Sequence, residues 1–163
     1  MKRIYKLHCE LLVKRPIKET FAFFENPANL GQITPPWLSF TIVSADKVEM
    51  RQGAQFNYVI RWLGFPMKWR SLISKYEPPF IFVDEQVIGP YKTWHHQHTF
   101  LETADGVIVG DHLEYSLPLG PLGAIAQAVM VKRQLESVFR FRQQALSRIF
   151  AGQTEQLVAP SIV

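Results

Sequence analysis

Residues 94–100, with the sequence WHHQHTF, carry the side chains of this chain that are best suited to chemistry. Side chains alternate along a β-strand with a period of two. One face of such a strand then carries two aromatic rings and two imidazoles: Trp94, His96, His98 and Phe100. An imidazole can donate, accept or transfer a proton near neutral pH. Two imidazoles bracketed by large aromatic rings predict the wall of an apolar cavity whose few polar groups orient a ligand.

A carboxylate on the following strand is predicted to join these histidines. The Asp-Gly pair at 105–106 is typical of a two-residue hairpin turn. If the two residues that flank this pair face each other, His96 lies opposite Tyr115, and Asp111 lies diagonal to His98. A carboxylate beside an imidazole fixes its tautomer and raises its pKa. The pattern predicts a polar cluster of His98 and Asp111 on an apolar wall, which His96 can join.

Four roles are open for this cluster. In the first, the imidazoles satisfy their ring nitrogens through Asp111, Tyr115 or water, and the cluster only shapes the cavity. In the second, His96 and His98 hydrogen-bond a hydroxyl, carbonyl or carboxylate group of a ligand. In the third, one histidine is a general acid or base on an enolisable or hydrolysable substrate, with His98 and Asp111 as the catalytic pair. The fourth is a metal site with Asp111 as third ligand, but a clear fourth group is missing, so no metal ion or other cofactor is predicted.

Two further charged residues are candidate ligand contacts. Asp84 shares a strand face with Phe82, but the residues of the opposite face are equally apolar, so the pattern does not fix the direction of Asp84. Arg142 falls within the apolar stripe of a predicted helix. It can anchor an anionic ligand group, pair with a buried carboxylate, or extend past the helix end into water. The other predicted ligand contacts are aromatic and favour a ring-containing ligand: Tyr58, Trp69, Phe82, Tyr115 and Phe139.

The elements that must position these residues follow one another in a simple order. Residues 3–15 alternate between apolar and polar side chains, which predicts a half-buried strand that Pro16 ends. Two short helices are predicted next, over 16–24 and about 27–33. Breaks at glycine and proline then separate six predicted strands: 38–48, 53–63, 66–76, 80–88, 92–103 and 107–117. An amphipathic helix is predicted over about 119–150.

This order predicts a single domain of the α+β class. A curved, seven-stranded antiparallel sheet wraps around the long C-terminal helix, and two short helices follow the first strand. Sheet and helix do not fill all the space between them, so a cavity opens. The chain of 163 residues has the length of one domain. We expect residues 1–151 to form one ligand-binding domain and residues 152–163, which lose periodicity, to form a C-terminal tail.

Composition excludes several classes of function. The net charge is +4, but no nucleic-acid motif accompanies it, so a solvated basic face is expected and no nucleic-acid partner is predicted. The single Cys9 excludes an internal disulfide and a multi-cysteine zinc module. No run approaches the roughly 20 apolar residues of a membrane span, and the N-terminus lacks the apolar core of a signal peptide. A cytoplasmic location is the simplest interpretation.

Several residues within this order resemble a known superfamily. They are Pro79-Phe-x-Phe-x-Asp84-x-Gln86, Gly89-Pro90-Tyr91, Trp94-x-His96-x-His98-x-Phe100, Leu117-Pro118 and Phe139-Arg-Phe-Arg142. Over about residues 3–150 the chain resembles the START-like superfamily, also called SRPBCC, which has the helix-grip fold of the birch-pollen allergen. The motifs are similar to those of a bacterial SRPBCC subgroup of ligand-binding domain proteins, often labelled polyketide cyclase/dehydrase-like.

The resemblance implies a cavity for a hydrophobic or amphipathic small molecule, such as a lipid or an aromatic compound. It does not identify the ligand, because this fold serves carriers and enzymes alike. The predicted function is therefore the binding of such a molecule. The alternative is a cyclase or dehydratase that acts in the same cavity, with His98 and Asp111 as catalytic groups and His96 as a positioning group. A regulatory protein would need an exposed apolar patch, which nothing in the sequence demands.

Overall fold

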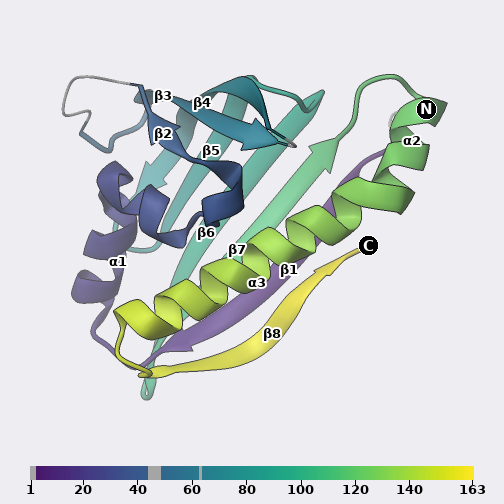
Figure 1. Cartoon of the computed structure of the whole chain (residues 1–163). Helices are drawn as coiled ribbons and strands as arrows, with labels where there is room; N and C mark the ends of the chain where they lie inside the picture. The colour runs from purple at the N-terminus through teal and green to yellow at the C-terminus, as the bar shows by residue number, and fades with distance from the viewer. Residues whose placement is uncertain (1–2, 44–48, 63) are drawn as a thin grey trace.

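An eight-stranded antiparallel sheet and one long helix form the protein (Figure 1). The computed structural model describes residues 3–43, 49–62 and 64–163. The strands lie in the order β2-β3-β4-β5-β6-β7-β1-β8. Their bounds are β1 Tyr5–Val13, β2 Thr41–Ile42, β3 Gln55–Trp62, β4 Phe65–Glu77, β5 Ile81–Ile88, β6 Thr93–Thr103, β7 Gly106–Ser116 and β8 Thr154–Ile162. The predicted α+β helix-grip architecture is confirmed, with one strand more than expected.

The additional strand is β8, which replaces the predicted C-terminal tail. It pairs with β1 in antiparallel fashion, and the register shifts twice along the pair. These irregularities interrupt the alternation of buried and exposed side chains, so only Pro160 and Ile162 of the strand are buried. An edge strand also tolerates a proline, since one of its sides donates no ladder hydrogen bond. The segment therefore lacks the period of two by which a strand is recognised from sequence.

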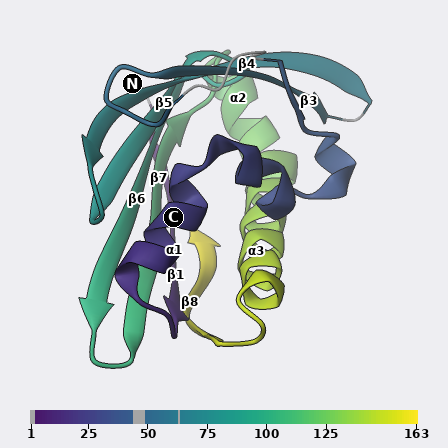
Figure 2. The ribbon, with the colours of Figure 1, turned by 90° about the vertical axis from the view of Figure 1, so that its left-hand side faces the viewer.

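The helices cover the concave side of the sheet. Helix α1 (Ile17–Glu25) is followed by two 3₁₀ segments, η1 (Pro27–Ile33) and η2 (Pro36–Leu38). The predicted C-terminal helix is divided into α2 (Pro121–Ala126), a π turn (Gln127–Val131) and α3 (Lys132–Ile149). In the view of Figure 2 the sheet bends from β6 and β7 over to β3 and β4, and α3 lies within this bend. No helix in the described ranges is long and apolar enough to cross a membrane.

The predicted strand over 38–48 is much shorter in the structure. Its first residue, Leu38, ends the segment η2, and β2, which pairs with β3, has two residues. Residues 44–48 of this prediction, like residue 63 of the next predicted strand, lie outside the described residues.

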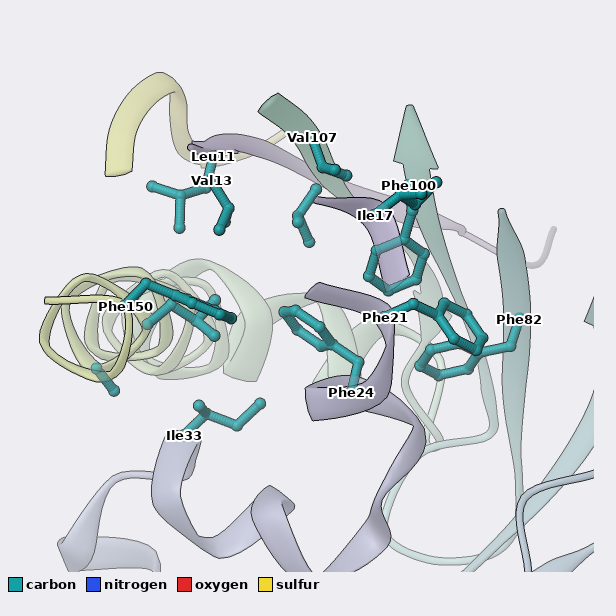
Figure 3. Close-up of a cluster of buried hydrophobic side chains, with 13 residues drawn as sticks. Leu11, Val13, Ile17, Phe21, Phe24, Ile33, Phe82, Phe100, Val107 and Phe150 are labelled. Atoms are coloured by element: carbon teal, nitrogen blue, oxygen red, sulfur yellow. The ribbon is translucent and has the colours of Figure 1, made fainter. Parts of the chain in front are cut away.

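Two apolar clusters lie on either side of a polar layer. In the first, α1 inserts Phe21 and Phe24 against Phe100, with ring centroids 5.1 Å apart in both edge-to-face pairs (Figure 3). The second surrounds Tyr115 and Phe139 nearer the start of α3. Along β7 the first cluster includes Val109 and the second includes Leu113 and Tyr115, with Asp111 between them. The candidate polar residues thus sit between two packed cores.

The hairpin between β6 and β7 differs from the predicted register by two residues. Thr103 pairs with Gly106, so residues 104 and 105 form the turn, whereas the expectation was a turn at 105–106. Gly106 has a φ of +139°, and a Cβ on it would lie 2.3 Å from the carbonyl oxygen of Val13. The glycine is thus needed for the close approach to β1 and not for the centre of the turn. A shift of two leaves every side chain on its predicted face.

Candidate functional site

Four side chains from three neighbouring strands meet on the inner face of the sheet. Asp84 of β5 pairs in register with His96 of β6, and His98 of β6 pairs with Asp111 of β7. The nitrogen Nε2 of His98 donates to Oδ2 of Asp84 at 2.7 Å. The nitrogen Nε2 of His96 donates to Oδ1 of Asp111 at 3.0 Å. The predicted diagonal contact between His98 and Asp111 is a direct one, with Nδ1 of His98 and Oδ1 of Asp111 3.3 Å apart.

Arg142 closes this cluster from the side of helix α3. Its Nε donates to Oδ2 of Asp111 at 3.1 Å, and Nη2 lies 3.3 Å from Nδ1 of His98. The side chains of Arg142 and Asp111 are 7% and 5% exposed. Of the three environments open to Arg142 from the sequence, the structure shows the pair with a buried carboxylate. Arg142 thereby ties α3 to the middle of β7.

Burial and charge act in opposite directions on the two carboxylates. Burial favours the neutral form of Asp111, but the Arg142 guanidinium and the hydrogen bonds from His96 and His98 outweigh it and hold its pKa well below the usual value. Burial likewise opposes the charge of Asp84, whose pKa is nevertheless lowered by the hydrogen bond from His98 and the nearby imidazoles. Both carboxylates are therefore charged at neutral pH.

The two imidazoles respond differently to this environment. Burial and the neighbouring His98 lower the pKa of His96. Burial also disfavours a charged His98, but its contacts with Asp111 and Asp84 outweigh this and raise its pKa. His98 is consequently the more readily protonated member of the pair, and it stacks on Phe82 with ring centroids 4.1 Å apart. The site contains one neutral and one readily protonated imidazole side by side.

A cavity of about 410 Å³ opens against this cluster, between the sheet, α1, η1 and the C-terminal helices. Nine of the predicted ligand contacts line it: Tyr58, Trp69, Phe82, Asp84, Trp94, His96, His98, Phe139 and Arg142. Asp84 points inward, which the sequence did not determine. It is the most accessible member of the cluster, with 18% of its side chain exposed against 5–8% for the others.

Three predicted ligand contacts lie away from the cavity wall. Phe100 packs against α1 in the first apolar cluster. Tyr115 is completely buried, and its hydroxyl accepts a hydrogen bond of 2.6 Å from Gln127 Nε2. Asp111 lies behind the two imidazoles. The alternation placed all three on the inner face, but the inner face also contains the packed cores, so facing inward does not by itself bring a residue to the cavity.

Ser71 is a polar wall residue that the sequence reasoning passed over. Its hydroxyl lies 3.1 Å from the Tyr58 hydroxyl and accepts a hydrogen bond of 3.1 Å from Trp69 Nε1. It shares a strand face with Trp69, which was the available signal. The thiol of the buried Cys9 lies 3.9 Å from Asp111 Oδ2, and burial together with that carboxylate raises the pKa of the thiol.

Comparison with known proteins identifies the fold. No family model matches the chain, and no curated protein matches its sequence. Norcoclaurine synthase from Thalictrum flavum is similar in structure with a TM-score of 0.64 and 14% identity, over 92% of this chain and 88% of that one. Protein Ms6760 from Mycobacterium smegmatis has a TM-score of 0.61 and 16% identity, over 88% and 92% of the two chains.

A third similar structure is the di-domain aromatase/cyclase StfQ of the steffimycin biosynthetic pathway. Its TM-score is 0.63 at 14% identity, over 90% of this chain. The chain spans about half the length of this protein, since the match covers 52% of it. At these identities the likeness shows the fold alone, which is the START-like helix-grip fold.

Proposed function

We propose that the protein binds an amphipathic small molecule whose apolar, ring-bearing body fills the cavity and whose polar end meets the cluster. The observation that carries this proposal is the distribution of charge on the wall. Among the described lining residues, the carboxylate, imidazole and guanidinium groups are gathered at one place: Asp84, His96, His98 and Arg142. A volume of about 410 Å³ lies in the range of small-molecule sites, which are mostly apolar with a few polar groups.

The wall favours a flat ring system next to a hydrogen-bond donor. Tyr58 and Trp69 stack with ring planes 15° apart, and Trp94 meets Trp69 edge to face at 5.1 Å. Such aromatic faces pack well against another ring. Asp84 is the accessible end of the cluster and is an acceptor when ionised. A ligand hydroxyl or amine is therefore the group that best matches the polar end.

The test is a binding titration with 2-naphthol, which has two flat rings and one hydroxyl, against naphthalene, which lacks the hydroxyl. We expect saturable quenching of tryptophan fluorescence by 2-naphthol, and about tenfold weaker binding in Asp84→Asn because a hydrogen bond to a charged group is lost. Naphthalene, which has no hydroxyl, should bind the unchanged protein and Asp84→Asn with equal affinity. Glu85→Gln is the matched control, since Glu85 contacts His95 at 2.8 Å in an exposed pair.

Two results would refute the binding proposal. One is the absence of saturable 2-naphthol binding up to its solubility. The other is an equal loss of affinity in Asp84→Asn and Glu85→Gln, which would mean that the hydroxyl does not meet the cluster.

A second candidate function is proton-transfer catalysis in the same cavity. The observation that favours it is the pair of His98 and Asp84 on the wall, joined at 2.7 Å, in which His98 has a raised pKa. Perturbed pairs of this kind are suited to general acid–base chemistry. For an enzyme, the sequence paired His98 with Asp111. Asp111 does not reach the cavity wall, so Asp84 is the carboxylate partner of His98 in this candidate. Neighbours of the fold include proteins named as a cyclase and a synthase.

This candidate is tested by exchange of α-protons. With 2-tetralone, a ring ketone with acidic α-protons, in deuterated buffer, an enzyme of this kind incorporates deuterium faster than buffer alone. His98→Gln should abolish the acceleration, while His95→Gln on the outer face should not. Exchange at the buffer rate, or equal acceleration by His98→Gln, would exclude His98 as acid or base for such ketones.

A further inference from the structure

Three potential metal ligands converge on the cavity side of the cluster. One ligand atom each from Asp84, His96 and His98 can be chosen so that all three lie within 4.8 Å of one another. Oδ2 of Asp84 lies 2.7 Å from Nε2 of His98 and 3.5 Å from Nδ1 of His96. Metal–ligand bonds of about 2.1 Å separate neighbouring ligand atoms by about 3.0–3.4 Å. Small rotations of these side chains therefore bring the three atoms to coordination distance of one ion.

The opposite nitrogen of each imidazole faces one shared carboxylate. Asp111 Oδ1 lies 3.0 Å from Nε2 of His96 and 3.3 Å from Nδ1 of His98. Metal-binding histidines commonly donate their other N–H to a carboxylate, which fixes the tautomer and the ring orientation. With protons on these two nitrogens, the lone pairs of His96 Nδ1 and His98 Nε2 point toward Asp84. Arg142 in turn holds Asp111 through its Nε at 3.1 Å.

One contact competes with this arrangement. Nη2 of Arg142 lies 3.3 Å from Nδ1 of His98, and a guanidinium can only donate. The same nitrogen therefore has two alternatives: it accepts from Arg142 while Nε2 donates to Asp84, or it donates to Asp111 while Nε2 is free to coordinate. The second alternative keeps Arg142 bound, because its Nε bond to Oδ2 of Asp111 remains.

The charges in the cluster also suit a cation. Two carboxylates and one guanidinium, with both imidazoles neutral, sum to one negative charge in a buried site. A divalent ion would convert this to one positive charge, which an anionic oxygen of a cavity ligand, such as a deprotonated hydroxyl, can neutralise. Buried charges need partners of opposite sign, and a bound ion provides one.

We propose that Asp84, His96 and His98 bind one divalent transition-metal ion, with its remaining coordination positions open to the apolar cavity. Two histidines and one carboxylate with open positions are the ligand set of non-haem Fe(II) sites, and three protein ligands with one open position are typical of reactive zinc sites. The sequence offered Asp111 as the third ligand but no clear fourth group, so no metal ion was predicted. In the structure Asp111 lies behind the imidazoles, and Asp84 occupies the third position. The inference does not depend on which organic ligand fills the cavity.

The test is a titration of the full chain, first treated with EDTA and then dialysed free of it, with Co²⁺. Visible absorption bands of Co²⁺ report nitrogen and carboxylate coordination. We expect saturation at one ion per chain, and at least tenfold weaker binding in Asp84→Asn and in His98→Gln. Circular dichroism of each variant establishes that it is folded. Asp111→Asn should weaken binding by about 10- to 100-fold if its role is to orient the imidazoles.

The matched control is His8→Ala, on the outer face of the sheet. There Nδ1 of His8 and Nδ1 of His112 lie 3.0 Å apart, so this pair is the competing place for an adventitious ion. The proposal requires that His8→Ala leaves the absorption bands and the affinity unchanged. Bands that survive both cluster variants, or that vanish in His8→Ala, would overturn it, as would the absence of bands at one equivalent. Binding of 2-naphthol is measured separately in EDTA, so a failure of the metal site is distinguishable from a failure of the binding proposal.

Discussion

Replacing Arg142 with methionine tests the reasoning about the buried cluster most directly. Methionine keeps the length and apolar stem of the side chain, and it removes the only guanidinium on Asp111 in the described part of the chain. Asp111 then remains as a buried carboxylate whose counter-charge is gone. The two histidines still contact it, but only His98 readily carries a charge. The variant therefore exposes the energetic role of the ion pair.

The expected loss follows from the geometry of the pair. Both side chains are at most 7% exposed and their atoms are 3.1 Å apart, so solvent screens the interaction little. Removing one partner of such a pair costs about 3–5 kcal/mol of unfolding free energy, because an uncompensated charge stays buried. With a denaturant slope of about 2 kcal/mol per M urea, the unfolding midpoint should fall by about 1.5–2.5 M.

The assay is urea denaturation followed by circular dichroism and tryptophan fluorescence, with Arg140→Met as the control. Arg140 is exposed on the same helix, so its replacement should change the unfolding free energy by less than about 0.5 kcal/mol. The double variant Asp111→Asn/Arg142→Met should be about 1–3 kcal/mol more stable than the sum of the single effects, because the unpaired charge is gone. A loss below about 1 kcal/mol in Arg142→Met, or strict additivity, would refute the account.

Three further outcomes follow from the fold and the titrating groups. Removal of residues 153–163 should lower the unfolding free energy by at least about 2 kcal/mol in calorimetry, since burial of Ile162 alone contributes about 1.5–3 kcal/mol; an unchanged midpoint would mean that β8 is dispensable. Gly106→Ala should cost more than about 2 kcal/mol, and clearly more than Gly53→Ala, whose Cβ would meet nothing within 4 Å although its φ is also positive. Because the folded pKa of Asp111 lies below its unfolded value of 3.8, its stabilisation is present above that pH and is lost as the pH falls below it. Urea midpoints in EDTA should therefore fall steeply below about pH 4, and a flat profile there would contradict the charged state of the cluster.

Local alternation predicted the inner face of the central strands correctly. His96 and His98 point inward because the strand has a period of two, and this conclusion did not need the correct register. The turn was misplaced by one residue, since the Asp-Gly signal was read as the centre of the turn, and this displaced the strand register by two. An even shift preserves the face, so the histidines and Asp111 still met. The shift changed the geometry of one contact: His98 lies directly opposite Asp111, and not diagonal to it as predicted.

Sequence patterns could not orient Asp84. Phe82 and Val83 are both buried, so hydrophobicity does not distinguish the two faces of β5. The pairing of β4 with β5 also shifts register between Ile73 and Lys75, which breaks the link between position and face. The direction of Asp84 depends on its pairing with His96, a contact between strands. The residue that completes the cavity side of the cluster was therefore beyond local reasoning.

Arg142 illustrates how far an anomaly can be interpreted from one sequence. A charged residue in the apolar stripe of a helix signals a buried partner, an anion or a route to water, and periodicity cannot choose among them. The choice depends on Asp111, which is 31 positions earlier in the chain. Whether Arg142 reaches Asp111 is determined by how α3 lies over β7, and this arrangement follows from the packing of the whole sheet.

The position of the cluster fits the proposed function. A buried ion pair stabilises a protein no more than apolar residues of similar volume do, because both charges lose their hydration. The apolar clusters on either side already pack α1 and α3 against the sheet. The fold could therefore close over an apolar layer at this position without loss of stability. Instead, two carboxylates, two imidazoles and a guanidinium are held there by mutual contacts, and four of these five groups reach the cavity wall. Such an arrangement is expected where a site must hold polar groups in fixed positions against an apolar ligand.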